Sequence, residues 1–264
     1  MLKKILMCRP TYYRVDYSIN PWMQIGSVDL ELAKQQWQAL VTQYEQLGVR
    51  VSFIDQEKNY PDMVFAADQA VAIDEKTMLL SRFTYPERHG ETAFYKQWYE
   101  SNGYTVKQLP EEMNFEGCGE LQRWRDQLFI GTGFRTGRKA ARLVGKLCEK
   151  EVHVLELVDS SFYHLDTCFM VLNDQTVFYY PPAFSDHSIA QLQQLVPNLV
   201  SLDDHDVLKF FANSVVVGST VLMQKGSIEA PKQLKKLGYT VKEIDVSEFI
   251  KAGGGAHCLT GELG

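Results

Sequence analysis

Five polar segments of the chain carry side chains that perform nucleophilic and acid–base chemistry, and these segments recur at similar intervals. Successive segments are 54, 48, 49 and 45 residues apart when counted from the first acid of the first segment. In chain order their candidate residues are Asp62 with Asp68, Glu116, His164 with Asp166, Asn213 and Cys258. If these residues only formed turns, there would be no reason for acids, a base, an amide and a thiol to recur at the same interval. The spacing therefore predicts one composite site.

A thiol within reach of an imidazole forms a nucleophile and its base, and a carboxylate orients the imidazole or shares its proton. Three glycines precede Cys258 and permit close backbone approach around the sulfur. Additional carboxylates near a thiol raise its pKa and oppose thiolate formation. That cost is removed when the substrate is a permanent cation. A guanidinium is planar, always charged and rich in N–H donors, so we expect it to bind between Asp68 and Asp166.

Repeated secondary structure supplies the scaffold for these segments. Amphipathic helical stretches run into short apolar strands five times, and four of these units continue through the polar segment into a hairpin. The expected strands start near Val49, Tyr104, Val152, Leu199 and Tyr239. A unit of one helix and three strands cannot bury its sheet alone, so the copies must pack together.

The ends of the chain decide between a line of units and a closed ring. A strand-like segment, KKILMCRP, has no partner at the N-terminus, and only LTGELG follows the last site residue. If the N-terminal strand completes the fifth unit's sheet, the ring closes and no edge remains. We predict one α/β domain over residues 1–264, a five-bladed propeller with pseudo-five-fold repeats of about 48 residues.

Composition excludes several classes of function. The 264 residues include 27 Lys and Arg against 33 Asp and Glu, and the net charge of −6 argues against a nucleic-acid partner. No apolar run approaches the ~18 residues of a membrane span, and the N-terminal apolar run is too short for a secretion signal. Five cysteines without such a signal predict free thiols and a cytoplasmic protein. The oligomeric state stays open, with a homodimer as one option.

The sequence resembles the guanidino-group-modifying enzymes, the pentein superfamily of arginine deiminases, dimethylargininases, arginine dihydrolases and amidinotransferases. The resemblance covers essentially the whole chain. It rests on the segments LMCRPTYYRVDYSINPWM, PDMVFAAD, YPERHGE, FEGCGE, GFRT, HLDTCF and GGGAHC in that order. Together these segments are most similar to the compact single-domain arginine or dimethylarginine hydrolases.

The resemblance implies a covalent route that needs no metal and no organic cofactor. Cys258 would attack the guanidinium carbon, and His164 would protonate the leaving amine and then activate water. Glu116 would assist His164 or hold the guanidinium. The product would be citrulline with ammonia or an alkylamine. The implied substrate-binding residues are Asp62, Phe65 and Asp68 of PDMVFAAD, Asp166 of HLDTCF, and two candidates for clamping an α-carboxylate, Arg88 and Arg135.

Departures from the family pattern leave several alternatives open. Glu120 stands where deiminases commonly have Asp, so its role is undecided, and Asp166 stands where dimethylargininases often have Lys. Dihydrolases that form ornithine tend to carry Asn at the place of Asp68, which favours citrulline here. Amidino transfer and ornithine production remain alternatives, as does a non-catalytic ribosome-binding propeller. We expect Asn213 only to cap its loop and His257 to point away from Cys258.

Overall fold

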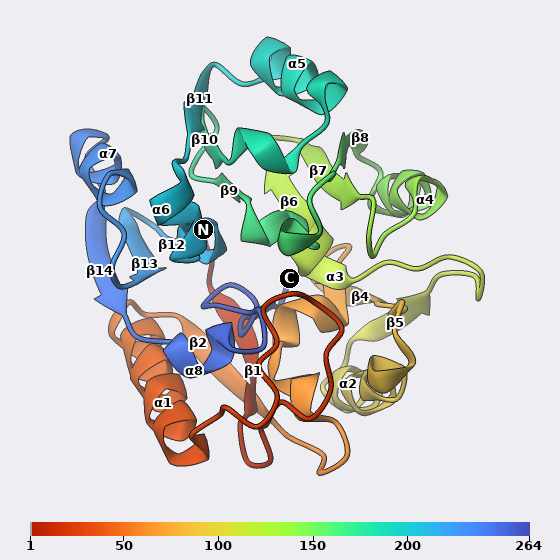
Figure 1. Cartoon of the computed structure of the whole chain (residues 1–264). Helices are drawn as coiled ribbons and strands as arrows, with labels where there is room; N and C mark the ends of the chain where they lie inside the picture. The colour runs from red at the N-terminus through yellow and green to blue at the C-terminus, as the bar shows by residue number, and fades with distance from the viewer. Residues whose placement is uncertain (1) are drawn as a thin grey trace.

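The computed structural model describes residues 2–264 and contains five separate three-stranded sheets with the longer helices outside them. Figure 1 shows the sheets spread around the middle of the molecule, with both chain ends near the centre. The strands are β1 Lys4–Arg9, β2 Arg50–Asp55, β3 Ala70–Ala72, β4 Thr77–Leu80, β5 Thr105–Gln108, β6 Leu121–Trp124, β7 Gln127–Thr132, β8 Glu151–Glu156, β9 Phe169–Val171, β10 Thr176–Tyr179, β11 Asn198–Ser201, β12 Val215–Val217, β13 Thr220–Gln224, β14 Thr240–Ile244 and β15 Gly261–Glu262.

Each of the five helices of seven or more residues directly precedes the strand that pairs in parallel with the middle strand of a sheet. They are α1 Leu30–Gln46, α2 Glu91–Ser101, α4 Arg138–Cys148, α5 Asp186–Leu195 and α7 Ala230–Lys236. The shorter helical turns are α3 Gly117–Glu120, α6 Asp204–Leu208, α8 Ser247–Ile250, η1 Pro61–Val64, η2 Ala66–Gln69, η3 Pro86–Arg88, η4 Ser160–Phe162, η5 Leu165–Thr167, η6 Pro181–Ala183 and η7 Phe211–Asn213. In residues 2–264 no helix is both long and apolar enough to cross a bilayer.

Every sheet has the same internal order, in which the central strand pairs antiparallel with one neighbour and parallel with the other. In four sheets a hairpin supplies the antiparallel pair, and a helix crosses over to the parallel strand. The five strands that follow the helices begin at Arg50, Thr105, Glu151, Asn198 and Thr240, each within one residue of the expected start. The repeat in the sequence is thus a repeat in the fold.

The N-terminal strand has a different main partner from the one that we expected. β1 lies between β15 and β2: it pairs antiparallel with Gly261 and Glu262 and parallel with Arg50–Asp55. We expected it to complete the sheet of the fifth helix–strand unit, but β14 already forms a full sheet with its own hairpin, β12 and β13. The reason is that α1 provides the crossover that a parallel pair needs, so β1, α1 and β2 form one unit and β15 completes it.

Helix α1 illustrates how the scaffold fixes the central loops. The Asp29 side chain accepts a hydrogen bond from Leu32 N and begins the helix, and a left-handed Gly48 follows its end. Its inner face is buried, and Tyr44 Oη lies 2.7 Å from Thr260 Oγ1. That contact ties the helix to the loop that carries Cys258.

The five polar segments touch one another in a closed cycle. The first segment, at η2, contacts α3; α3 contacts η5; and η5 contacts η7. Asn213 of η7 bonds to Cys258, and Ala67 N of the first segment donates to Cys258 O at 3.0 Å. The repeated scaffold therefore gathers all five segments at one place.

Candidate active site

Cys258 lies in a tight turn that follows α8 and contains three consecutive glycines. A Cβ at Gly253, which has a φ of +88°, would lie 2.8 Å from both Asn20 Oδ1 and Tyr163 Oη. A Cβ at Gly254 would lie 2.3 Å from the Phe65 ring. Only glycine allows the backbone to approach these side chains so closely.

The Cys258 sulfur is 3.1 Å from Asp166 Oδ2 and 3.1 Å from Asn213 Nδ2. The residue is 2% exposed. Burial, and then the carboxylates of Asp166 and Asp68, raise the pKa of the Cys258 thiol well above its usual value. The protonated thiol is therefore the favoured form of this buried sulfur.

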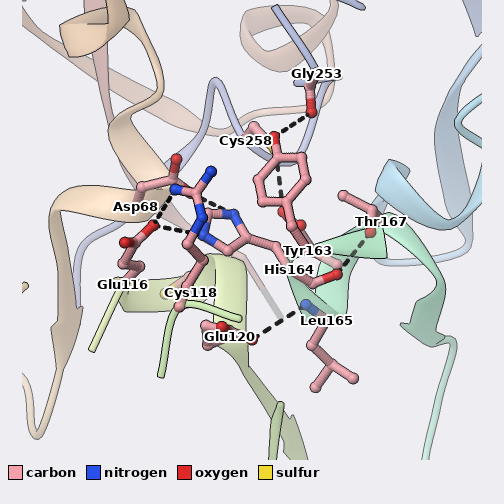
Figure 2. A network of polar contacts seen from close by, with 12 residues as sticks. Asp68, Glu116, Cys118, Glu120, Tyr163, His164, Leu165, Thr167, Gly253 and Cys258 are labelled. Atoms are coloured by element: carbon pink, nitrogen blue, oxygen red, sulfur yellow. Dashed lines mark hydrogen bonds and ion pairs between the residues drawn. The ribbon is translucent and has the colours of Figure 1, made fainter. Parts of the chain in front are cut away.

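His164 precedes η5 and is fully buried beside two acids. Its Nε2 lies 2.8 Å from Glu116 Oε2, and its Nδ1 lies 3.7 Å from Asp68 Oδ1. Burial alone lowers the pKa of His164, but Asp68 and Glu116 outweigh that effect and raise the pKa to about 9. Figure 2 shows Asp68, Glu116 and His164 pointing toward one another, with Tyr163 between His164 and the Cys258 loop. At neutral pH the imidazole is a cationic acid.

Glu116 balances this positive charge together with Arg135. Burial favours the neutral carboxyl, but Arg135 and the His164 hydrogen bond lower the pKa of Glu116 to about 2. Arg135 Nη1 is 3.0 Å from Glu116 Oε2, and its guanidinium lies between the rings of Tyr85 and Tyr163, at 4.5 and 4.7 Å. The acid therefore stays ionised under all ordinary conditions.

Asp68 is held from its other side by Arg88. The Arg88 guanidinium donates to Asp68 Oδ2 at 2.8 Å and to Asp62 O at 3.2 Å, and it also pairs with Glu91. Burial raises the pKa of Glu91 to about 7. This pairing turns Asp68 Oδ1 toward His164, so Arg88 fixes the direction in which Asp68 presents its free oxygen.

A small cavity opens next to the sulfur, and six of the nine predicted site residues line it: Asp62, Phe65, Asp68, Arg88, Arg135 and Cys258. The other three predicted residues contact these six: Glu116 pairs with Arg135, His164 with Asp68, and Asp166 with Cys258. Part of the cavity wall comes from the segment before α1, through Ile19, Asn20 and Met23. Asp62 accepts a hydrogen bond from Tyr17 Oη at 2.8 Å, which anchors that segment.

Four buried polar atoms around the site have no hydrogen-bond partner within residues 2–264. They are Asp68 Oδ1, Glu120 Oε1, His164 Nδ1 and Asp166 Oδ1. Buried polar groups in folded proteins almost always have partners, so these atoms are candidates for binding a polar ligand. Asp68 Oδ1 and Asp166 Oδ1 are carboxylate oxygens, which accept N–H donors and favour a cation.

Two contacts differ from what the sequence predicted, and both involve Asp166 or the sulfur. His257 Nδ1 lies 2.9 Å from Asp166 Oδ2, whereas we expected this imidazole to point away from Cys258. That expectation assumed an extended strand, but Thr260 N bonds to His257 O and the segment is a turn. Asn213 does cap the loop, through Gly255 N and Cys258 N, and it also donates to the sulfur. Its regular place in the repeat is the signal that could have revealed this second role.

Glu120 also lies inside the site region rather than on the surface. Its Oε2 accepts a hydrogen bond from Leu165 N at 3.3 Å, directly after His164, while its Oε1 has no partner within the described residues. Burial raises the pKa of Glu120 to about 8. A neutral carboxyl at neutral pH therefore supports the backbone next to the imidazole.

This fold and this set of residues are those of the guanidino-group-modifying superfamily. A family model described as eukaryotic N,N dimethylarginine dimethylhydrolase matches residues 16–264, and the chain belongs to this family. It is a family of hydrolases that act on amidino C–N bonds.

Individual relatives carry two different names. The chain is 38% identical over 266 residues to the bifunctional arginine dihydrolase/ornithine cyclodeaminase ArgZ of Synechocystis, covering 97% of this chain and 37% of that protein. It is 36% identical to the N(G),N(G)-dimethylarginine dimethylaminohydrolase of Mycobacterium tuberculosis, covering 99% of this chain and 86% of the relative. The chain thus spans little more than a third of the bifunctional protein.

The fold agrees closely with a solved relative. The crystal structure of the N-terminal domain of ArgZ with its substrate bound, in a variant with one cysteine replaced by serine, superposes with a TM-score of 0.95 at 37% identity. The match covers 98% of this chain and 97% of that domain. The described fold therefore corresponds to one whole domain of that relative.

Proposed function

We propose that this chain hydrolyses the guanidino group of arginine or a close analogue, including methylarginine, through a covalent intermediate on Cys258. The observation that carries the proposal is the pair of unpartnered carboxylate oxygens, Asp68 Oδ1 and Asp166 Oδ1, in the same buried site as the Cys258 thiol. Asp166 bonds directly to the sulfur, and Asp68 stands against His164. A planar cation with several N–H donors suits this arrangement.

In the bound state the guanidinium would donate to Asp68 and Asp166, which places its carbon next to the sulfur. Phe65 would form an apolar wall of the cavity, and Asp62 would add negative charge. Arg88 and Arg135 also line the cavity and are proposed to attract the α-carboxylate of an amino-acid substrate. Both guanidinium groups are already held by acids, so they are fixed in direction before a ligand binds.

In the first half-reaction the bound cation offsets Asp166 and Asp68, so the thiol loses its proton and the thiolate attacks the guanidinium carbon. The tetrahedral adduct then loses one nitrogen, which takes a proton from His164 and leaves as ammonia or alkylamine. A C–S bond has formed and a C–N bond has broken. The product of this step is an amidino group on Cys258 that keeps the positive charge.

In the second half-reaction His164, now neutral, takes a proton from a water molecule that attacks the same carbon. Collapse of the adduct breaks the C–S bond and gives the neutral urea group of citrulline, with the cysteine restored. The proton released by the thiol and the ammonia together leave as ammonium. Glu116 keeps the imidazole oriented throughout and stabilises its cationic form.

Ornithine production by a second hydrolysis is the alternative, and the 38% identity to a protein named as an arginine dihydrolase favours it. Asp68 favours citrulline, because dihydrolases of this superfamily tend to have Asn there. We further propose that residues 1–264 form one catalytic domain, a closed five-bladed propeller, that acts on a small guanidino compound in the cytoplasm. The ring of contacts between the five polar segments and the five free cysteines support these points.

The test is a panel of arginine, monomethylarginine, dimethylarginine and agmatine, assayed for ammonia, methylamines, citrulline and ornithine. We expect citrulline from arginine or a methylarginine, and no product from a folded Cys258→Ser variant. Turnover equal to wild type in that variant would refute the mechanism. Ornithine as the main product would identify the activity as that of an arginine dihydrolase. A new guanidino compound formed only when glycine is added would indicate amidino transfer.

A further inference from the structure

We propose that Asn213 is a further catalytic residue, whose side-chain amide donates a hydrogen bond to the Cys258 sulfur and stabilises the thiolate. The inference rests on the proposed role of Cys258 as nucleophile. Asn213 Nδ2 lies 3.1 Å from Cys258 Sγ, and Asn213 is 1% exposed. A hydrogen bond that is stronger to the charged form of a group lowers its pKa.

The orientation of the amide is fixed by its other contacts. Asn213 Oδ1 accepts from two backbone donors, Gly255 N at 3.0 Å and Cys258 N at 3.1 Å. An N–H₂ group cannot accept these bonds, so the oxygen must face the backbone and the nitrogen must face the sulfur. The remaining amide hydrogen is directed to Asp166 O, 3.3 Å away. Exchanging the oxygen and nitrogen positions would break the bonds to Gly255 N, Cys258 N and Asp166 O.

The backbone of Asn213 is fixed as firmly as its side chain. Asn213 ends η7, and its carbonyl accepts a hydrogen bond from His257 N at 3.0 Å. The turn begins at Phe210 with a φ of +58°, an uncommon conformation for a bulky residue. The Phe210 ring packs edge-on against Trp22 at 4.7 Å between centroids. The donor is therefore in place before the thiol ionises, and no reorganisation is needed.

A hydrogen-bond donor to the sulfur would offset the effects that oppose a thiolate in this site. Burial opposes a negative charge on the sulfur most strongly, and the two nearest acids, Asp166 and Asp68, oppose it further, while the backbone of Gly255 favours it. Asn213 is the side chain that donates to the sulfur in residues 2–264. The guanidinium and the amide would then act from different directions on one thiolate, since Asn213 belongs to the fourth polar segment and the acids belong to the first and third.

The experiment measures the reactivity of Cys258 without any turnover. The second-order rate of alkylation by 2-chloroacetamidine, a cationic guanidinium mimic, is followed between pH 6 and 10 by the mass of the Cys258 peptide. Two variants remove the donor: Asn213→Asp keeps the size and the acceptor, and Asn213→Ala removes both. Thr260→Val is the matched control, because Thr260 braces the same loop through Tyr44 without touching the sulfur.

In both Asn213 variants we expect the midpoint of the alkylation profile to rise by about one pH unit or more, with a roughly 10- to 100-fold lower rate at pH 7. Thr260→Val keeps the wild-type midpoint. The titratable groups that face the sulfur are Asp166, Asp68 and Tyr163, with His257 behind Asp166. Asn213→Ala and Thr260→Val leave this set unchanged, so Asn213→Ala measures the loss of the donor. Asn213→Asp adds a carboxylate next to the sulfur, so its rise also includes charge repulsion and should be the larger of the two.

Two results would overturn the proposal. One is an unchanged midpoint in either Asn213 variant that keeps wild-type circular dichroism, and Asn213→Asp serves here if the smaller variant does not fold. The other is an equal shift in Thr260→Val, which would trace the effect to a loosened loop. A chain that turns over no guanidino compound but shows the expected shifts would refute the proposed function and leave the role of Asn213 intact.

Discussion

Replacing Glu116 by Gln tests the charge balance around His164 more directly than any other change. Glu116 Oε1 accepts from Thr84 N at 2.9 Å, and its Oε2 accepts from His164 at 2.8 Å and Arg135 at 3.0 Å. Gln can keep the Thr84 bond with its carbonyl oxygen. Its N–H₂ group then faces two donors, so the anion that stabilises the imidazolium is lost.

The expected magnitude follows from the strength of the lost bond. A hydrogen bond to a charged group contributes about 1.5–3 kcal/mol, and each pKa unit corresponds to about 1.4 kcal/mol. The pKa of His164, about 9 in the wild type, should fall by about one to two units, because Asp68 still supports the cation. The change lowers the pKa since it removes a negative charge next to the protonated form.

This shift should appear in the alkaline limb of the pH–rate profile. In the proposed first half-reaction His164 acts as an acid, so the limb should report loss of its proton and move down by about one to two pH units. At pH 8.5 the rate should fall well below that of the wild type, while at pH 6.5 the loss should be smaller. The His164 Cε1 proton can be titrated by NMR in the Cys258→Ser background to measure the pKa without turnover.

A control separates this effect from general disturbance of a buried acid. Glu248→Gln alters another buried carboxylate, which bonds to Lys251 and Asp29 N and does not touch His164. We expect its alkaline limb to match the wild type. An unmoved limb and an unmoved NMR titration in a folded Glu116→Gln variant would refute the assignment of His164 as the acid that Glu116 supports.

The remaining predictions concern the space and the protonation around the imidazole. A Cβ at Gly119 would lie 2.7 Å from Asp68 Oδ1 and 2.8 Å from His164 Nδ1, so Gly119→Ala should abolish turnover in a folded protein. At Gly137 a Cβ meets nothing within 4 Å, so Gly137→Ala should keep wild-type turnover. Equal activity of the two variants would contradict this geometry. Burial raises the pKa of Glu120 from 4.5 to about 8, so the folded state holds a proton that the unfolded state has lost, and stability falls as pH rises through this range. Glu120→Gln should match the wild type in urea unfolding at pH 5 and be more stable at pH 8.5; parallel pH dependences would show that this carboxyl is ionised in the folded state.

Much of this architecture could be predicted because the chain repeats itself. The start of each post-helix strand follows from the change from helical to alternating periodicity, and the polar segments follow at a fixed offset. The partner of β1 could not be predicted in the same way, because KKILMCRP carries the same continuous apolar run, ILMC, whichever sheet it joins. The crossover through α1 selects β2, and that choice depends on tertiary packing.

The directions of individual side chains could not be predicted from the sequence either. Adjacent residues point to opposite faces only in an extended chain, and the turn after the three glycines brings both His257 and Cys258 to Asp166. The sequence also does not show that Arg88 is paired with Asp68, Glu91 and the backbone of Asp62. A motif can identify a residue type at a site, but only the pairings define which of its atoms remain free for a ligand.

Those pairings explain why the proposed reaction needs a cation and releases a neutral product. Asp68 is paired with Arg88 and Glu116 with Arg135, whereas Asp166 has no Arg or Lys partner in the described part of the chain. This carboxylate, paired with the His257 imidazole, faces the thiol and opposes its ionisation, and in the proposed reaction the bound guanidinium offsets it. The urea group of citrulline lacks that charge, so its formation restores the repulsion between Asp166 and the thiolate and favours reprotonation of the sulfur. Binding, activation and release are thus linked through one carboxylate, and a neutral isostere of arginine should leave Cys258 protonated.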